Sequence, residues 1–156
     1  MTLWWPRIDD VQAWLVAEGF HSRDWGLLSS ALERPLTTIS GQQMYPSLWL
    51  KLAALLDSVE RNHPLLDGNK RLGYLLLALI LEGNNINEAH VSDDDWYDLI
   101  IDSAAHHLEL EELARRIEAL VTAAPRFSNN DNCTNLSSLS LTNSTTTNFF
   151  DRGTMS

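Results

Sequence analysis

The stretch Lys-Arg-Leu-Gly-Tyr-Leu-Leu-Leu-Ala-Leu-Ile-Leu-Glu, residues 70–82, decides the fold. Between its charged ends it is apolar on every face of a helix, and a helix of that kind is buried on all sides. Gly83 follows directly and is a typical C-terminal helix stop. We therefore predict that residues 70–82 form the buried central helix of a helical bundle.

The chain on both sides of this helix carries apolar residues at helical spacing. Residues 47–61 place leucines and a valine along one stripe, which predicts a strongly amphipathic helix. Further helices are predicted over residues 9–18, 25–33, 93–107 and 109–121. Neither an internal repeat nor sustained strand alternation accompanies them, so we expect an all-α protein, folded as a compact bundle.

Residues 34–46 interrupt the helical pattern with Pro, Thr, Gly and Gln. We predict an extended loop there. Within it Thr37, Thr38 and Ile39 are all β-branched, and such residues favour strand geometry. The loop is therefore expected to form a short strand-like flap.

The composition changes near Pro125. From Phe127 to Ser156, 18 of 30 residues are Asn, Ser or Thr, and apolar periodicity is weak. Such a segment cannot offset its ordering entropy by burying apolar surface. We predict one folded domain over residues 1–124 and a low-complexity, disordered tail over residues 125–156.

The 156-residue chain has a net charge of −10 and one cysteine, Cys133. A general nucleic-acid binder normally carries a basic face, so direct nucleic-acid binding is not expected. One cysteine cannot form an internal disulfide, which fits a reducing compartment. The first ten residues do not resemble a secretory signal, and the longest apolar run, Tyr74 to Leu81, is too short to span a membrane. We expect a soluble cytoplasmic protein without membrane contact.

Residues 63–71, His-Pro-Leu-Leu-Asp-Gly-Asn-Lys-Arg, gather polar groups between two predicted helices. Gly68 permits a positive φ or a close backbone approach. Asn69, Lys70 and Arg71 stand at the start of the central helix, where free N–H groups and the helix dipole attract anions. The two cations add a point charge and a bidentate fork. This pattern predicts a phosphate-binding helix end.

Two further side chains of this string suit phosphate chemistry. Asp67 is a hard oxygen ligand of the kind that binds Mg²⁺ bridging phosphates. His63 can be neutral near pH 7 and take a proton from an attacking hydroxyl. Each residue alone is explained as well by a turn, a cap or a solvated charge. Because all of them converge on one helix end, the string predicts phosphoryl or nucleotidyl transfer.

This string resembles the motif of the Fic/Doc family, His-Pro-Phe-x-Asp/Glu-Gly-Asn-Gly-Arg followed after two further residues by Arg. Lys70 stands where most Fic proteins have Gly, and Tyr74 stands where the second Arg would be, which is typical of the Doc branch. Leu65 replaces the motif Phe and should still serve as an apolar anchor. Residues 23–35, Arg-Asp-Trp-Gly-Leu-Leu-Ser-Ser-Ala-Leu-Glu-Arg-Pro, also resemble a Doc segment. The resemblance spans roughly residues 8–120.

The resemblance implies a role for each residue of the string. His63 would be the catalytic base for a Ser or Thr hydroxyl of a target protein. Asp67, the second catalytic residue, would hold Mg²⁺ or orient that hydroxyl. The phosphates of ATP would be bound by Gly68, Asn69, Lys70 and Arg71.

The resemblance also implies partners. The flap at Thr37, Thr38 and Ile39 would dock the target chain by strand-like pairing. Doc-like proteins transfer the γ-phosphate of ATP to elongation factor Tu and arrest translation. Their usual partner is a Phd-like antitoxin, whose helical C-terminal segment covers the site.

Two alternatives stay open at this point. A Fic-type AMP transferase is disfavoured by Lys70 and Tyr74. A non-catalytic Doc-like binding or co-repressor module is disfavoured because it need not retain the intact string of residues 63–71.

Overall fold

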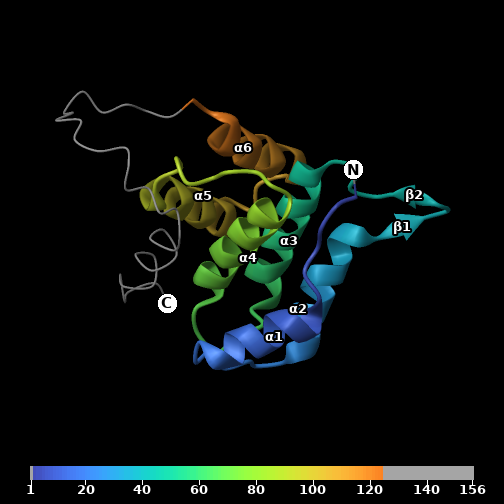
Figure 1. Cartoon of the computed structure of the whole chain (residues 1–156), viewed down its shortest axis with the longest axis vertical. Helices are drawn as coiled ribbons and strands as arrows, with labels where there is room; N and C mark the ends of the chain where they lie inside the picture. Colours follow the sequence, from blue (N-terminus) through green and yellow to red (C-terminus); the bar gives the residue numbers. More distant parts are fainter. Residues whose placement is uncertain (1, 125–156) are drawn as a thin grey trace.

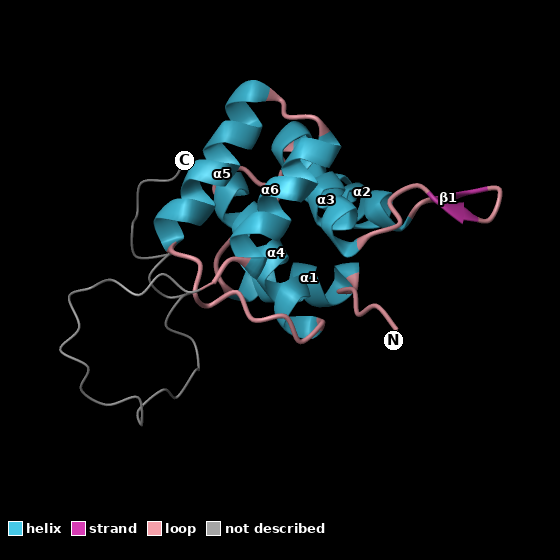
Figure 2. Ribbon diagram, turned by 90° about the horizontal axis from the view of Figure 1, so that it is seen from above, coloured by secondary structure: helices cyan, strands magenta, loops and turns pink. Residues whose placement is uncertain are grey.

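The computed structural model of the chain describes residues 2–124. Within that range the chain forms six α-helices, one short 3₁₀ helix and one two-stranded hairpin (Figures 1 and 2). The elements are α1 (Ile8–Ala17), α2 (Trp25–Glu33), η1 (Arg34–Leu36), β1 (Thr38–Ile39), β2 (Gln42–Gln43), α3 (Leu48–Asn62), α4 (Asn69–Gly83), α5 (Asp93–His106) and α6 (Leu110–Thr122). The all-α prediction is confirmed. No helix within these residues combines the length and hydropathy needed to span a bilayer, and the predicted tail lies outside the described residues.

Side-chain caps set where three of the helices begin. Asp24 accepts a hydrogen bond from the Gly26 N–H at the start of α2, and Ser47 and Ser92 cap α3 and α5 in the same way. Each cap satisfies one of the N–H groups that a helix leaves without an internal partner. The start of α4 differs, because its N-cap is Gly68, which has no side chain to offer.

The centre of the bundle is shared by α3 and α4. As predicted, α4 is buried along most of its length, although Ala78 and Leu79 are only half-buried. Helix α3 is more deeply embedded than its amphipathic pattern indicated, because every residue from Lys51 to Val59 is buried. It contacts α2, η1, α4, α5 and α6. The polar residues of this buried stretch, Lys51, Asp57 and Ser58, therefore face other parts of the protein rather than solvent.

A hairpin projects from the N-terminal end of α3 (Figures 1 and 2). Strands β1 and β2 are antiparallel, with Thr38 opposite Gln43 and Ile39 opposite Gln42. All four of these residues are exposed, and the predicted flap is present. The sequence predicts that the segment before the hairpin is extended. In the structure this segment instead forms the 3₁₀ helix η1. The fixed φ of Pro35 is compatible with a first helical turn, so the chain turns once more before the hairpin.

The base of the hairpin is tied to α3 by a buried lysine. The Nζ of Lys51 donates hydrogen bonds to Gln43 Oε1, at 2.7 Å, and to the carbonyl of Tyr45. Burial lowers the pKa of Lys51. The hairpin is thus anchored at its base, while its strands stand in solvent.

Candidate active site

The loop that joins α3 to α4 contains most of the predicted motif and is held against the α1–α2 connection. The carbonyl of Pro64 accepts hydrogen bonds from the Arg23 N–H at 2.9 Å and from Ser22 Oγ at 3.0 Å. Two residues further on, the Leu66 N–H donates to the carbonyl of His21 at 2.9 Å. These bonds on both sides of Leu65 fix the course of the loop backbone.

His63 is the first residue after α3 and has a left-handed backbone, with φ 46°. A non-glycine residue in that region costs on the order of 1 kcal/mol, and such residues cluster at functional sites. Its N–H still bonds to the carbonyl of Val59, and its side chain is exposed. The turn therefore ends α3 at a histidine that solvent can reach.

The next part of the loop is anchored from inside. Leu65 is 2% exposed and fills the position of the apolar anchor, as expected. The Asn69 side chain accepts a hydrogen bond from the Leu65 N–H at 2.9 Å and donates one to the Leu65 carbonyl at 3.0 Å. The sequence predicts phosphate binding by Asn69. Its side-chain amide is engaged by the loop backbone, so for the backbone N–H this role stays a prediction. Its side chain shapes the loop, and only its backbone N–H belongs to the helix end.

The N-terminus of α4 has the features of an anion site. The first helical hydrogen bond runs from the Leu72 N–H to the Gly68 carbonyl at 2.9 Å. The N–H groups of Asn69, Lys70 and Arg71 thus precede the helical ladder, at the positive end of the dipole. Gly68 has φ 89°, and a Cβ there would lie 2.9 Å from a ring carbon of Phe20. Glycine is required at this position by both conformation and space.

A hollow of about 270 Å³ lies beside this helix end. Asp67, Gly68 and Arg71 line it together with Leu66 and the turn of residues 18–21. The Nε of Arg71 is buried and has no hydrogen-bond partner among residues 2–124. A buried donor of this kind is costly unless an acceptor reaches it, so it suits a phosphate oxygen.

Glu60, a residue that the sequence pattern does not mark, lies close enough to Lys70 of the motif for their charges to interact. Burial raises the pKa of Glu60, and the charge of Lys70 acts in the opposite direction. Its Oε1 would lie 3.8 Å from a Cβ at Gly73, one turn beyond Lys70 on α4. Its position one turn before His63 on α3 is the only sequence signal that could have identified it.

Asp67 is exposed and lies at the edge of the hollow that Arg71 lines. No group of three or more His, Cys, Asp or Glu side chains in the described part of the chain could hold a metal ion. Mg²⁺ in nucleotide sites is usually held by one or two carboxylates together with phosphates and water. A single carboxylate beside an anion site fits an ion that arrives with the nucleotide.

The structure gathers the motif but not the flap. His63, Asp67, Gly68, Asn69, Lys70 and Arg71 lie on one loop and one helix start. Thr37, Thr38 and Ile39 are exposed at the other end of α3 (Figure 1). His63 comes twelve positions after Lys51, which lies at the base of the hairpin. At the rise of an α-helix, the two residues are about 18 Å apart along the axis of α3.

The comparisons with known proteins agree with the motif. The model of the Fic/DOC family matches residues 6–81, which include the whole loop. The chain is 38% identical over 127 residues to "Toxin Doc" of Mycolicibacterium smegmatis, an alignment that covers 80% of this chain and 98% of that protein. No solved structure matches. The chain belongs to the Fic/Doc family.

Proposed function

We propose that this protein is a Doc-type toxin that transfers the γ-phosphate of ATP to a Ser or Thr hydroxyl of elongation factor Tu and thereby arrests translation. The observation that carries the proposal is the start of α4, which no side chain caps and where Arg71 lines one hollow with Asp67, directly after the loop that begins at His63. Lys70 in place of the usual Gly, and Tyr74 in place of the second Arg, favour phosphate over AMP transfer. The similarity to a protein named as a Doc toxin supports the same conclusion.

In the proposed reaction the target hydroxyl oxygen attacks the γ-phosphorus of ATP. The imidazole of His63 takes the hydroxyl proton, the bond from the γ-phosphorus to the bridging oxygen breaks, and ADP leaves. The N–H groups at the start of α4, with Lys70 and Arg71, stabilise the charge on the transferred group. Asp67 would hold a Mg²⁺ ion that, when bound, neutralises part of the triphosphate charge.

The proposal includes a partner. A toxin of this kind, acting in the cytoplasm, needs an inhibitor, and we propose a Phd-like antitoxin with a helical segment that covers the motif. The exposed side chains of His63 and Asp67 are compatible with such a cover. Production of the chain without an antitoxin should stop cell growth, and normal growth with abundant soluble protein would count against a toxin.

The direct test uses the purified chain, elongation factor Tu and ATP labelled at either the α- or the γ-phosphate. We expect label on the factor only from γ-labelled ATP, and none with the His63→Ala variant. Label only from α-labelled ATP would assign the chain to AMP transfer instead. Absence of label from both, with wild-type protein that binds ATP and the factor, would favour a non-catalytic binding module.

A further inference from the structure

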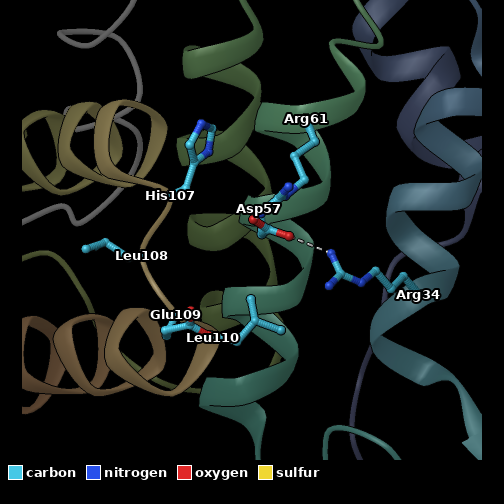
Figure 3. Close-up of a pocket in the computed structure, with 7 residues that line it drawn as sticks. All are labelled: Arg34, Asp57, Arg61, His107, Leu108, Glu109 and Leu110. Carbon is cyan, nitrogen blue, oxygen red and sulfur yellow. Dashed lines mark hydrogen bonds and ion pairs between the residues drawn. The ribbon is translucent and has the colours of Figure 1, made fainter.

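Two hollows that share part of their lining lie beside α3. The first, of about 330 Å³, is lined by Arg34, Asp57, Arg61, the α5–α6 connection at residues 107–109, and Leu110 of α6 (Figure 3). The second, of about 270 Å³, shares Asp57, Arg61 and His107 with the first and reaches His63. Because three residues line both hollows, we treat them as one channel and call it the α3 groove.

One end of the α3 groove lies beside the base of the hairpin. Arg34 lines that end, and its Nε donates a hydrogen bond to the hydroxyl of Tyr45 at 3.1 Å. Its guanidinium also lies 5.7 Å from the centre of the Tyr45 ring, and Tyr45 follows β2 by two residues. The other end is at His63. The groove therefore occupies the interval between the flap and the candidate base.

The cations of the groove are held in fixed positions. The nearly buried carboxylate of Asp57 accepts from Arg34 Nη1 at 2.7 Å and from Arg61 Nε at 2.8 Å. The Arg61 side chain is 57% exposed, and its two Nη groups have no hydrogen-bond partner among the described residues. The groove thus presents oriented donors whose ordering entropy has already been lost on folding.

The charges of the groove disfavour a triphosphate. Its walls contain three carboxyl groups, of Asp57, Glu60 and Glu109, beside two arginines and the imidazoles of His63 and His107. A nucleotide is better served by the start of α4, where Lys70 and Arg71 add to the helix dipole. Mixed donors and acceptors along a channel suit a polypeptide backbone instead.

We propose that the α3 groove binds the segment of the target protein that runs from the hairpin to the modified hydroxyl at His63. This inference rests on the proposed function and names its docking surface. Arg61 donates to a backbone carbonyl of the segment, and the exposed carboxylate of Glu109 pairs with a basic side chain. Glu109 lines only the hollow that Arg34 also lines, and His63 lines only the other, so the basic side chain lies on the hairpin side of the hydroxyl.

The test separates the two substrates kinetically. Arg61→Ala should raise the KM for the target protein on the order of tenfold, the loss expected for one charge-assisted hydrogen bond, and leave the KM for ATP unchanged. Arg61→Lys keeps the positive charge but loses the two Nη donors of the guanidinium, so its KM for the target protein should lie between those of the wild type and Arg61→Ala. Arg115→Ala is the matched control, because Arg115 is exposed on α6, pairs with Glu112 and lines neither hollow. A higher KM for ATP alone would overturn the proposal and make the groove a nucleotide site.

A second variant tests the predicted charge pairing. Glu109→Lys should reverse the preference between target peptides that carry a basic and an acidic residue on the hairpin side of the hydroxyl. Unchanged preference would overturn the pairing. Loss of affinity for the antitoxin alone, with target kinetics intact, would assign the groove to the antitoxin.

Binding measurements keep this test independent of the chemistry. In a His63→Ala background, the affinity for the unmodified target protein should fall when Arg61→Ala is added. If the wild-type chain transfers no label at all, the proposed phosphotransfer fails. The proposal that the α3 groove binds the target is overturned only if adding Arg61→Ala leaves the affinity for the target protein unchanged.

Discussion

The two ends of α3 are built in opposite ways. At the C-terminal end, the loop after His63 is bonded to the α1–α2 connection on one side and to the Asn69 side chain on the other. At the N-terminal end, the strands of the hairpin bond to each other and stand exposed, with ties to the bundle only at the base. Chemistry needs reacting groups held within a fraction of an ångström. Docking of an extended chain needs an accessible strand edge. Under the proposed function, the chemical step therefore belongs to the fixed end and target recognition to the exposed end.

The largest effect that this comparison predicts is at the fixed end. His63→Ala should lower the rate of phosphate transfer by about two to four orders of magnitude, the usual loss when a general base is removed. Nucleotide affinity should be unchanged, because the imidazole acts on the hydroxyl proton and not on the phosphates. Calorimetric titration with a non-hydrolysable ATP analogue checks this, and an equal loss of affinity would show that His63 also binds nucleotide.

The next effect separates Lys70 from His63. Lys70→Ala should weaken ATP binding and transfer together, because a cation on the phosphates serves the ground state and the transition state alike. Lys70→Gly restores the usual Fic residue. Transfer of the γ-phosphate should then fall and AMP transfer should be weak, since Tyr74 still replaces the second Arg. Full γ-phosphate transfer by either variant would contradict the role given to Lys70.

The loop anchor should show an effect on stability as well as on rate. Asn69→Ala removes both bonds to the Leu65 backbone and leaves a buried N–H and carbonyl without those partners. We expect a loss of about 1–3 kcal/mol in the free energy of unfolding, measured with urea, and slower transfer. Asn69→Asp keeps the acceptor for the Leu65 N–H, so it should fall between Ala and wild type. Wild-type stability in Asn69→Ala would mean that the loop does not depend on this clamp.

A substitution in the hairpin, at the exposed end of α3, should change the KM for the target and not the stability of the fold. Thr38→Pro removes a backbone donor from a strand whose residues are all exposed. If the hairpin loses one or two hydrogen bonds to the target protein, the KM for that protein should rise by up to about tenfold. The unfolding midpoint and the KM for ATP should stay near the wild-type values. A fall in kcat as large as the rise in KM would indicate that the hairpin takes part in the chemical step.

The smallest effect concerns Glu60, next to the fixed end. Burial raises the pKa of Glu60, so the folded protein keeps this proton to higher pH than the unfolded chain does. Its contribution to stability is complete below the ordinary pKa of about 4.3 and is lost as pH rises through the raised folded-state pKa. Glu60→Gln should therefore melt a few degrees above wild type at neutral pH. The difference should vanish in acid, and a variant less stable at neutral pH would show that the attraction to Lys70 outweighs burial.

The sequence predicts the helices well because the signals that bound them are local. Every predicted helix is present with ends within one residue of those observed, since the caps Ser47 and Ser92 and the stop at Gly83 lie next to the elements they limit. The motif could be predicted for the same reason, because its residues are contiguous. The surroundings of Glu60 and Arg61 could not, because Lys70 of α4 and His107 after α5 come near these residues only in the folded chain.

The sequence pattern also did not predict how deeply α3 is buried. Lys51, Asp57 and Ser58 indicate a solvated face, yet all three are buried. Their partners are Gln43 and Tyr45 for the lysine and Arg34 for the other two. Pairing of polar groups between separate elements cannot be read from the hydropathy of one helix.

We propose that the loop after α3 transfers a phosphate to a protein hydroxyl. The most direct test is the intact mass of elongation factor Tu recovered from cells after production of this chain without an antitoxin. We predict a gain of one phosphoryl group on the factor in arrested cells, and an unmodified factor with His63→Ala. An unmodified factor in cells arrested by the wild-type chain, or a gain of one adenylyl group, would contradict the account.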